Sequence, residues 1–314
     1  MAPDTSPVDR AAAKGVAIVS VLLVVALATM IVSALFFREQ IAVRSVENRL
    51  LLSQGRWIER AALDWAKVIL LADGRSGPVD HLQEPWATPV AETQLDETVT
   101  AGARLREGER APLLMGQMFD AQGRMNLTNL ELGGKPSEVY LDGLRRLLEI
   151  LRLPVSLADT ITERVLLSRQ HLVDGKPAPP TMLPPQRLED LLGSPGFDEE
   201  TVAALVPFVV FLPRVTPLNL NTAPAEVIGA MVPGIDLAAA QRFVAKRERT
   251  FFSNLAAAGT QFDNQPTLSS QLFSVGSSYF LVHGMVRFGR VESVSDTLLE
   301  RSGQKVEVVW QRRY

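Results

Sequence analysis

The side chains that most often carry catalysis or bind metals are sparse in this chain of 314 residues. It contains no cysteine, which excludes disulfides, thiolate metal ligation and a cysteine nucleophile. The three histidines, His81, His171 and His283, lie far apart in the sequence, without the paired spacing of a histidine metal site. We expect them to be surface or capping residues.

Sequence motifs for acyl, phosphate or nucleotide chemistry are missing as well. The chain has no G-x-S-x-G, no Walker A loop and no G-x-G-x-x-G after a predicted strand. The net charge of −3 and a pI near 5.8 also argue against a generally basic nucleic-acid binder. We therefore expect a binding or assembling protein, not an enzyme.

Residues 219–249 (NLNTAPAEVIGAMVPGIDLAAAQRFVAKRER) are the best candidate for a binding function. They resemble a helix-hairpin-helix module, in which a Gly-x-Gly hairpin offers backbone N–H groups to a DNA phosphate. Lys246, Arg247 and Arg249 could add contacts. However, Asp236 replaces the second hairpin glycine and places a carboxylate at the phosphate position. We favour a structural helical pair and keep a membrane-anchored periplasmic DNA-binding protein as an alternative.

The hairpin has an internal counterpart, since SPGFD at 194–198 recurs as VPGID at 232–236. Both predict a helix, a tight turn and a second helix, with Pro-Gly ending the first helix and aspartate capping the second. Asn221 and Thr222 read as N-cap residues, with Pro224 in the first turn of the helix that follows.

The elements that position these residues begin with an apolar run. Val16–Phe37 holds no charge, proline or glycine, and as a helix it would be roughly 33 Å long, enough for a bilayer core. Because the run continues helically into Arg38, with no small-residue cleavage site after it, we expect a transmembrane helix and not a removed Sec signal. Flanking positive charges lie on both sides, so they do not set the orientation.

We expect one unbroken helix from Val16 to about Leu71, roughly 80 Å long. Its second half carries an apolar stripe made of Val43, Val46, Leu50, Trp57, Ala61, Trp65 and Val68. The spacings of three, four and seven are typical of a helix face that packs on a core. We predict that the stripe, with both tryptophans, packs on the protein's own globular domain.

After the long helix, the pattern of apolar and polar residues changes twice along the chain. Residues 73–111 are rich in Gly, Pro and charge and predict loops with short strands, followed by a strand pair, Leu113–Phe119 and Arg124–Leu127, across a turn. From Ser137 to Ala258 the pattern is helical, with a proline-rich linker at Lys176–Pro185. A closing antiparallel meander is predicted from three alternating segments: Tyr279–Arg287, Val291–Glu300 and Lys305–Gln311.

The sequence AKG|VAIVS around residue 15 resembles the cleavage site of type IV prepilin-like proteins, in which a charged leader ends in glycine before a long apolar helix. The resemblance implies that a prepilin peptidase cuts between Gly15 and Val16 and that the new N-terminus, Val16, is methylated. Most such subunits carry glutamate at the fifth mature position, where it pairs with a neighbour's amino terminus. Here that position is Ser20.

A subunit without this glutamate resembles the minor pseudopilin K family of type II secretion systems. Three further segments resemble family motifs: Val79–Ala87, Phe119–Leu127 (D-x-x-G-R-x-N-L) and Leu218–Ala223 (N-x-N-T-A). The resemblance implies an α+β fold with a long N-terminal transmembrane helix, a pilin-like α/β core with an antiparallel sheet, and a large inserted all-helical domain.

The expected divisions are a leader (1–15), a transmembrane helix (16–37), a periplasmic amphipathic helix (38–72), the first part of the core (73–136), the helical insertion (137–262) and the closing β-meander (263–314).

The function implied by this resemblance is mechanical. The subunit would cap the tip of the periplasmic pseudopilus, nucleate its assembly and support export of folded proteins, with Ser20 marking the tip position. The implied partners are the I- and J-type minor pseudopilins, the major pseudopilin, the prepilin peptidase and the inner-membrane assembly platform, with no nucleic acid. The implied location is the inner membrane, single-pass, with the head in the periplasm. A minor pilin of a type IV pilus is a second alternative.

Calcium is the one cofactor the resemblance raises, since similar proteins can bind it in the helical insertion. The corresponding residues 161–170 (ITERVLLSRQ) lack the family's aspartates, and the loop after them is shortened. Calcium takes roughly six to eight oxygen ligands, which cannot be assembled here. No cofactor is assigned, and the metal ligands remain unknown.

Overall fold

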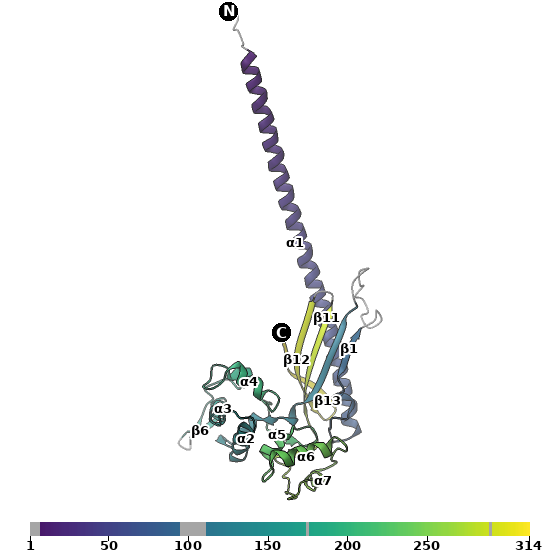
Figure 1. Ribbon diagram of the computed structural model, residues 1–314, viewed down its shortest axis with the longest axis vertical. Helices are drawn as coiled ribbons and strands as arrows, with labels where there is room; N and C mark the ends of the chain where they lie inside the picture. The colour runs from purple at the N-terminus through teal and green to yellow at the C-terminus, as the bar shows by residue number, and fades with distance from the viewer. Residues whose placement is uncertain (1–6, 95–110, 174–175, 289–290) are drawn as a thin grey trace, which may run out of the picture.

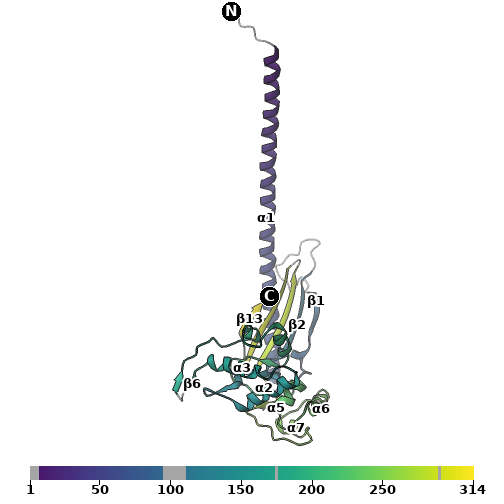
Figure 2. The same ribbon diagram turned by 60° about the vertical axis from the view of Figure 1, so that its left-hand side comes forward.

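The computed structural model describes residues 7–94, 111–173, 176–288 and 291–314. One long helix, α1 (Pro7–Ser76), joins a head in which an antiparallel sheet packs on the end of α1 and a group of helices lies beyond the sheet (Figures 1 and 2). The expected α+β fold and unbroken helix are confirmed, and α1 is roughly 105 Å long at about 1.5 Å per residue. Among the described residues, α1 is the one helix long and apolar enough to span a membrane.

The face of α1 that packs on the head is not the predicted one. Trp57 and Trp65 are 68% and 53% exposed, and the rest of the predicted stripe is exposed too. The buried positions of this half of α1 are Gly55, Glu59, Ala66 and Leu70. Trp57 and Glu59 are two residues apart and so point about 200° apart around the helix. The buried face of α1 therefore carries these four residues, and both tryptophans lie on the outside.

The sheet has five strands, each antiparallel to its neighbours, in the order β1-β2-β11-β12-β13. These are β1 (Val90–Gln94), β2 (Leu113–Asp120), β11 (Tyr279–Phe288), β12 (Val291–Ser302) and β13 (Lys305–Arg313). The closing meander β11-β12-β13 is confirmed. A 3-10 turn, η1 (Pro85–Ala87), leads into β1 and buries Trp86. The core between α1 and the sheet consists of Ala66, Leu70, Trp86, Met118, Phe280 and Leu299.

The predicted strand pair of residues 113–119 and 124–127 is wrong. β2 runs to Asp120, whose side chain accepts a hydrogen bond from the Gln122 N–H and starts a 3-10 turn, η2 (Ala121–Gly123). The next strand, β3 (Met125–Asn126), pairs in parallel with β8 (Val209–Val210) and not with β2. The turn therefore carries the chain out of the sheet into the helical domain.

The helical domain contains α2 (Glu138–Ile150), α3 (Leu157–Leu167), α4 (Glu199–Leu205), α5 (Ala225–Met231), α6 (Leu237–Arg247) and α7 (Leu255–Gly259). Two further 3-10 turns are η3 (Leu127–Leu130) and η4 (Leu188–Leu191). The short paired strands are β4 (Glu131–Leu132) with β5 (Lys135–Pro136), β6 (His171–Val173) with β7 (Lys176–Ala178), and β9 (Leu218–Asn219) with β10 (Phe273–Ser274).

The apolar core of this domain is larger than the predicted insertion, because it runs from Met125 to Phe273 whereas the expected bounds are 137 and 262. The two Pro-Gly turns are confirmed. Gly196 and Gly234 have φ of 82° and 72°, a region that favours glycine. Asp198 and Asp236 cap α4 and α6, each accepting a backbone N–H three residues on at 2.7 Å.

Candidate functional site

The predicted processing site lies on the free end of α1. Residues 1–6 of the leader fall outside the described residues, whereas the backbone at Gly15 is helical and Val16 is exposed. The Ser20 hydroxyl donates to the Val16 carbonyl over 2.9 Å. A serine satisfies its hydrogen-bonding group inside its own helix in this way, whereas a carboxylate at this depth needs a partner from outside. Cleavage and methylation at Val16 stay predictions.

The three head segments that carry the family resemblance meet at one buried place, where α1 ends and the sheet borders the helical domain. We call this place the motif junction and define it by Asp80, Asp120, Asn219, Thr222 and Ser277. Sequence reasoning singled out the segments at 79–87, 119–127 and 218–223 but did not place them together. The structure shows that they form one hydrogen-bonded network.

Asp120 is the centre of the motif junction. Its Oδ2 accepts from Asn219 Nδ2 at 2.8 Å, from Thr222 Oγ1 at 2.6 Å and from Ser277 Oγ at 2.6 Å. Its Oδ1 accepts from the Gln122 N–H at 2.8 Å. Burial raises the pKa of Asp120, and these four donors oppose that shift because they favour the ionised form. The carboxylate thus joins the end of β2 to two other segments.

Asp80 links the motif junction to the end of α1 through Arg301. The Asp80 carboxylate accepts from Arg301 Nη2 and, at 2.7 Å, from the Ser277 N–H. Arg301 Nη1 donates to Asp73 of α1 at 2.7 Å, and its guanidinium lies 4.8 Å from the Phe280 ring centroid. Burial raises the pKa of Asp80 to about 7, although the Arg301 charge pulls it down.

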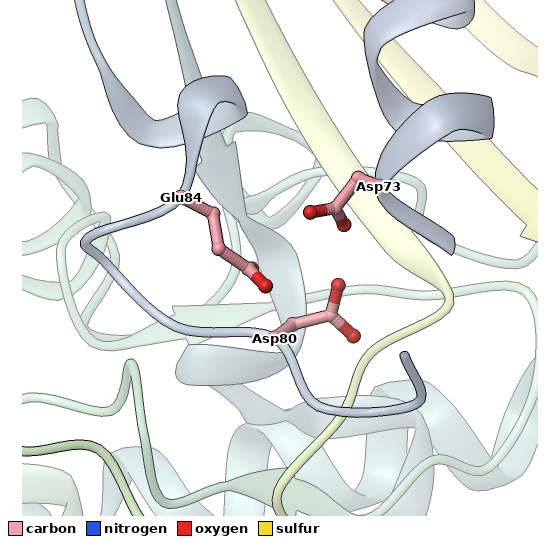
Figure 3. A group of neighbouring side chains, drawn as sticks. All are labelled: Asp73, Asp80 and Glu84. Carbon is pink, nitrogen blue, oxygen red and sulfur yellow. The ribbon is translucent and has the colours of Figure 1, made fainter. Parts of the chain in front are cut away.

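Asp73, Asp80 and Glu84 point toward one another (Figure 3), with carboxylate oxygens within 4.8 Å. Such a spacing can hold a divalent cation, but these oxygens already have partners. Arg301 binds both aspartates, and Glu84 Oε2 accepts from Trp86 Nε1 at 2.7 Å. The arrangement is therefore an ion-pair network closed by a guanidinium. The segment at 161–170, which corresponds to the calcium-binding region of similar proteins, lies largely in α3 and is distant in sequence from these carboxylates.

The predicted N-cap role of Asn221 and Thr222 is wrong. Pro224 occupies the N-cap of α5 without any side-chain cap, so the helix begins later than the sequence suggested. Thr222 binds Asp120 instead, and Asn221 holds both the N–H and the carbonyl of Phe252 at 2.9 Å. Both polar side chains therefore stabilise long-range contacts, and Pro224 alone occupies the start of α5.

Of the three basic residues predicted to contact DNA, Arg247 and Lys246 bind carbonyl groups of the chain, whereas Arg249 is exposed. Arg247 is buried and donates to the Leu220 and Ala223 carbonyls at 2.8 and 2.6 Å, and burial lowers its pKa to about 10. Lys246 donates to the Gln261 carbonyl at 2.8 Å. These contacts favour the structural interpretation of the helical pair, because Arg247 points inward and donates to the backbone of the N-x-N-T-A segment.

The histidines with described side chains make local contacts. His81 stacks on Phe251 with ring centroids 3.9 Å apart, and its Nδ1 accepts from the Gln83 N–H. His283 is half exposed and pairs with Asp296 at 2.7 Å. The side chain of His171 lies outside the described residues.

Sequence reasoning missed Arg301 and Ser277. A signal for Arg301 existed, because it directly follows the predicted strand Val291–Glu300, and a charge next to buried strand positions needs a partner. Ser277 follows Gly276, where a Cβ would lie 2.2 Å from the Pro78 carbonyl oxygen. Only the fold reveals that close approach.

Comparisons with known proteins show which proteins this chain is similar to. The family model described as type II secretion system (T2SS), protein K, matches residues 218–283. The type II secretion system protein K of Pseudomonas aeruginosa is 31% identical over 93% of this chain and 90% of that protein. The protein of the same name from Klebsiella pneumoniae is 25% identical over 96% of each chain.

A solved structure, the GspK–GspI–GspJ complex of the type 2 secretion system of enterotoxigenic Escherichia coli, contains a chain with a similar fold. The likeness has a TM-score of 0.66 at 18% identity and covers 86% of this chain and 99% of that chain.

Proposed function

This chain belongs to the type II secretion system protein K family and is a minor pseudopilin, and from that premise we propose that it caps the tip of the periplasmic pseudopilus. In this position it nucleates the filament together with other minor pseudopilins and supports the export of folded proteins across the outer membrane. The role is structural, and its working surfaces are α1 and the head.

The observation that carries the proposal is an apolar face of α1 that is exposed in the described part of the chain. From Val16 to Val68 large apolar side chains stay exposed, including Trp57 and Trp65 well beyond the predicted membrane span. Large exposed apolar surfaces outside the membrane are typical of interaction sites. A face that continues from the membrane span along the helix matches the helix of another membrane-anchored subunit.

Ser20 supports the tip position. A subunit inside a filament gains from a carboxylate at this place, because the amino terminus of the next subunit neutralises it. Ser20 forms its hydrogen bond to Val16 within α1 and needs no such neighbour. A subunit with nothing above it can therefore carry serine without leaving an unpaired charge in lipid.

The partners we propose are the I- and J-type minor pseudopilins, since the similar solved chain is part of a complex with GspI and GspJ. The major pseudopilin, the prepilin peptidase and the inner-membrane platform complete the set. The helix spans the inner membrane once, with the head in the periplasm. The inward contacts of Arg247 make the DNA-binding alternative weaker, and the 31% identical relative is a secretion protein and not a type IV pilin.

Site-specific photo-crosslinking tests this proposal. A photoreactive amino acid replaces Trp57 or Trp65 in the full chain, which is expressed in membranes together with I- and J-type minor pseudopilins. The control position is Asp263 in the helical domain, whose side chain is 86% exposed. We expect crosslinks to the I- or J-type subunits from the two α1 positions and none from position 263. Correctly inserted chain that crosslinks to no pseudopilin from either α1 position contradicts the proposal.

A further inference from the structure

The helical domain is tied to the sheet by two short connectors. The chain leaves the sheet at the end of β2 through residues 120–125 and returns to it through residues 274–279, just before β11. Figure 1 shows the helices of this domain beyond one end of the sheet, on the side away from the free end of α1. Without further contacts, two connectors of this length would leave the domain free to pivot about them.

The motif junction binds both connectors to each other and to the helical domain. Asp120 lies on the first connector and Ser277 on the second, and Ser277 Oγ donates to Asp120 Oδ2 at 2.6 Å. Asn219 and Thr222, from the helical domain, donate to the same oxygen. One carboxylate oxygen thus receives three hydrogen bonds, two from the helical domain and one from the second connector.

The network continues to α1. Asn219 Nδ2 also donates to the Asp80 carbonyl at 3.1 Å, and the Asp80 carboxylate binds Arg301. Arg301 then binds Asp73 and reaches the Leu70 carbonyl at 3.4 Å, both in the last turns of α1. A continuous series of hydrogen bonds, neutral at Asn219 and charged at Arg301, therefore runs from the helical domain to the end of the long helix.

Apolar packing across the same boundary is small by comparison. The core of the helical domain and the core under α1 are separate clusters. Between them lies a small cluster of four buried residues, Ala121, Leu212, Tyr279 and Leu298, on which the partly buried Val210, Val309 and Trp310 pack. The His81–Phe251 stack is a further contact with the helical domain. Two ion pairs also cross the boundary: Arg312 with Glu189, which are both exposed and contribute little, and Arg214 with Glu300, of which only Arg214 is exposed. Orientation across this boundary must then depend strongly on the directional polar contacts.

We propose that the motif junction is a latch that fixes the orientation of the helical domain relative to α1. Releasing Asp120 lets the domain pivot about the two connectors while each part keeps its own core. Buried polar networks of this kind specify one arrangement more than they add stability, because each member must meet its partners in a single geometry. For a subunit at the tip of a filament, the latch sets which surface the helical domain presents; the inference itself does not depend on that position.

Distance measurements between two spin labels test the latch. The chain has no cysteine, so Arg60→Cys on α1 and Gln241→Cys on α6 label it uniquely, and both positions are exposed. The full chain in lipid nanodiscs is compared with the same chain carrying Asp120→Asn. The matched control is Asp236→Asn, which changes an aspartate of the helical domain outside the motif junction. For the parent and the control we expect one narrow distribution of the distance between the two labels. In Asp120→Asn we expect a broader distribution with a second population at a different distance.

Two further variants keep the test decisive. Thr222→Val removes one donor to Asp120 with little change of shape and serves if Asp120→Asn fails to fold, as judged by far-UV circular dichroism. The pair Asp120→Asn with Asn219→Asp reverses donor and acceptor across their contact and should restore part of the narrow distribution. Folded Asp120→Asn and Thr222→Val chains that keep the parent distribution overturn the latch.

Discussion

Asn219 Nδ2 lies 2.8 Å from Asp120 Oδ2, although 99 residues separate the two in the sequence. The contact joins the D-x-x-G-R-x-N-L segment to the N-x-N-T-A segment. Gly123 and Thr222 make the same join sterically tight, because a Cβ on Gly123 would lie 2.7 Å from Thr222 Oγ1. The two segments therefore act as one structural unit between the sheet and the helical domain.

Gly276 is expected to be intolerant of any side chain. A Cβ there would lie 2.2 Å from the Pro78 carbonyl oxygen, so Gly276→Ala must push apart the segment that carries Asp80. We expect a loss of about 1–3 kcal/mol in the free energy of unfolding, measured by urea titration of the detergent-solubilised chain. Gly77→Ala is the control, since nothing lies within 4 Å of its Cβ position. Equal midpoints for the two variants would contradict the close approach.

The stability of the head should fall as pH rises from about 4 to 7. Burial raises the pKa of Asp80 to about 7, so the folded state binds this proton more tightly than the unfolded state. Such a group contributes stability that is fully present below the unfolded pKa and is lost as pH rises through the folded value. The pKa of Asp120 is also raised, so its ionisation likewise lowers the stability of the head as pH rises.

The measurement is the urea midpoint of the parent chain and of Asp80→Asn across this pH window. Asp80 faces Arg301 from β12, Asp73 from α1, Asp120 from β2, and His81 and Glu84 on its own segment. Since those neighbours remain in the variant, the difference between the two curves isolates Asp80. We expect a flatter pH dependence in Asp80→Asn, and parallel curves would refute the assignment.

Trp57 and Trp86 should respond oppositely to truncation. Trp57→Ala removes an exposed side chain and should change the free energy of unfolding by less than about 0.5 kcal/mol. Trp86→Ala empties a fully buried site beside Phe280 and should cost about 3–5 kcal/mol. Denaturation followed by far-UV circular dichroism separates the two. A large loss in Trp57→Ala would mean that this face packs within the chain after all.

Glu59 should anchor α1 to the edge of the sheet. Its carboxylate is nearly buried and accepts from Gln311 Nε2 at 2.7 Å and from Arg313 Nε at 2.9 Å. Glu59→Ala leaves these donors without their partner and should cost about 1–3 kcal/mol, with faster hydrogen exchange in β13. Asp64→Ala removes an exposed carboxylate that pairs with Lys67 and should cost less than about 1 kcal/mol. Unchanged exchange in β13 would argue against the anchor.

The features predicted correctly depend on local sequence. The long apolar helix, the β11-β12-β13 meander and the Asp-capped Pro-Gly turns each follow from residues within one segment. The periodicity on α1 revealed a helix but not which face packs, because the buried positions Gly55, Glu59, Ala66 and Leu70 lie outside the more apolar stripe that contains Trp57. The pairing of Met125 with Val209 and the reach of Thr222 to Asp120 join distant segments, which no local pattern specifies.

The measurement that tests the central claim most directly is the intact mass and N-terminal sequence of the chain expressed with and without a prepilin peptidase. A minor pseudopilin should lose residues 1–15 only when the peptidase is present and begin at a methylated Val16. Gly15→Leu should keep its leader in both cases. A chain that retains residues 1–15 in the presence of an active peptidase would contradict the account.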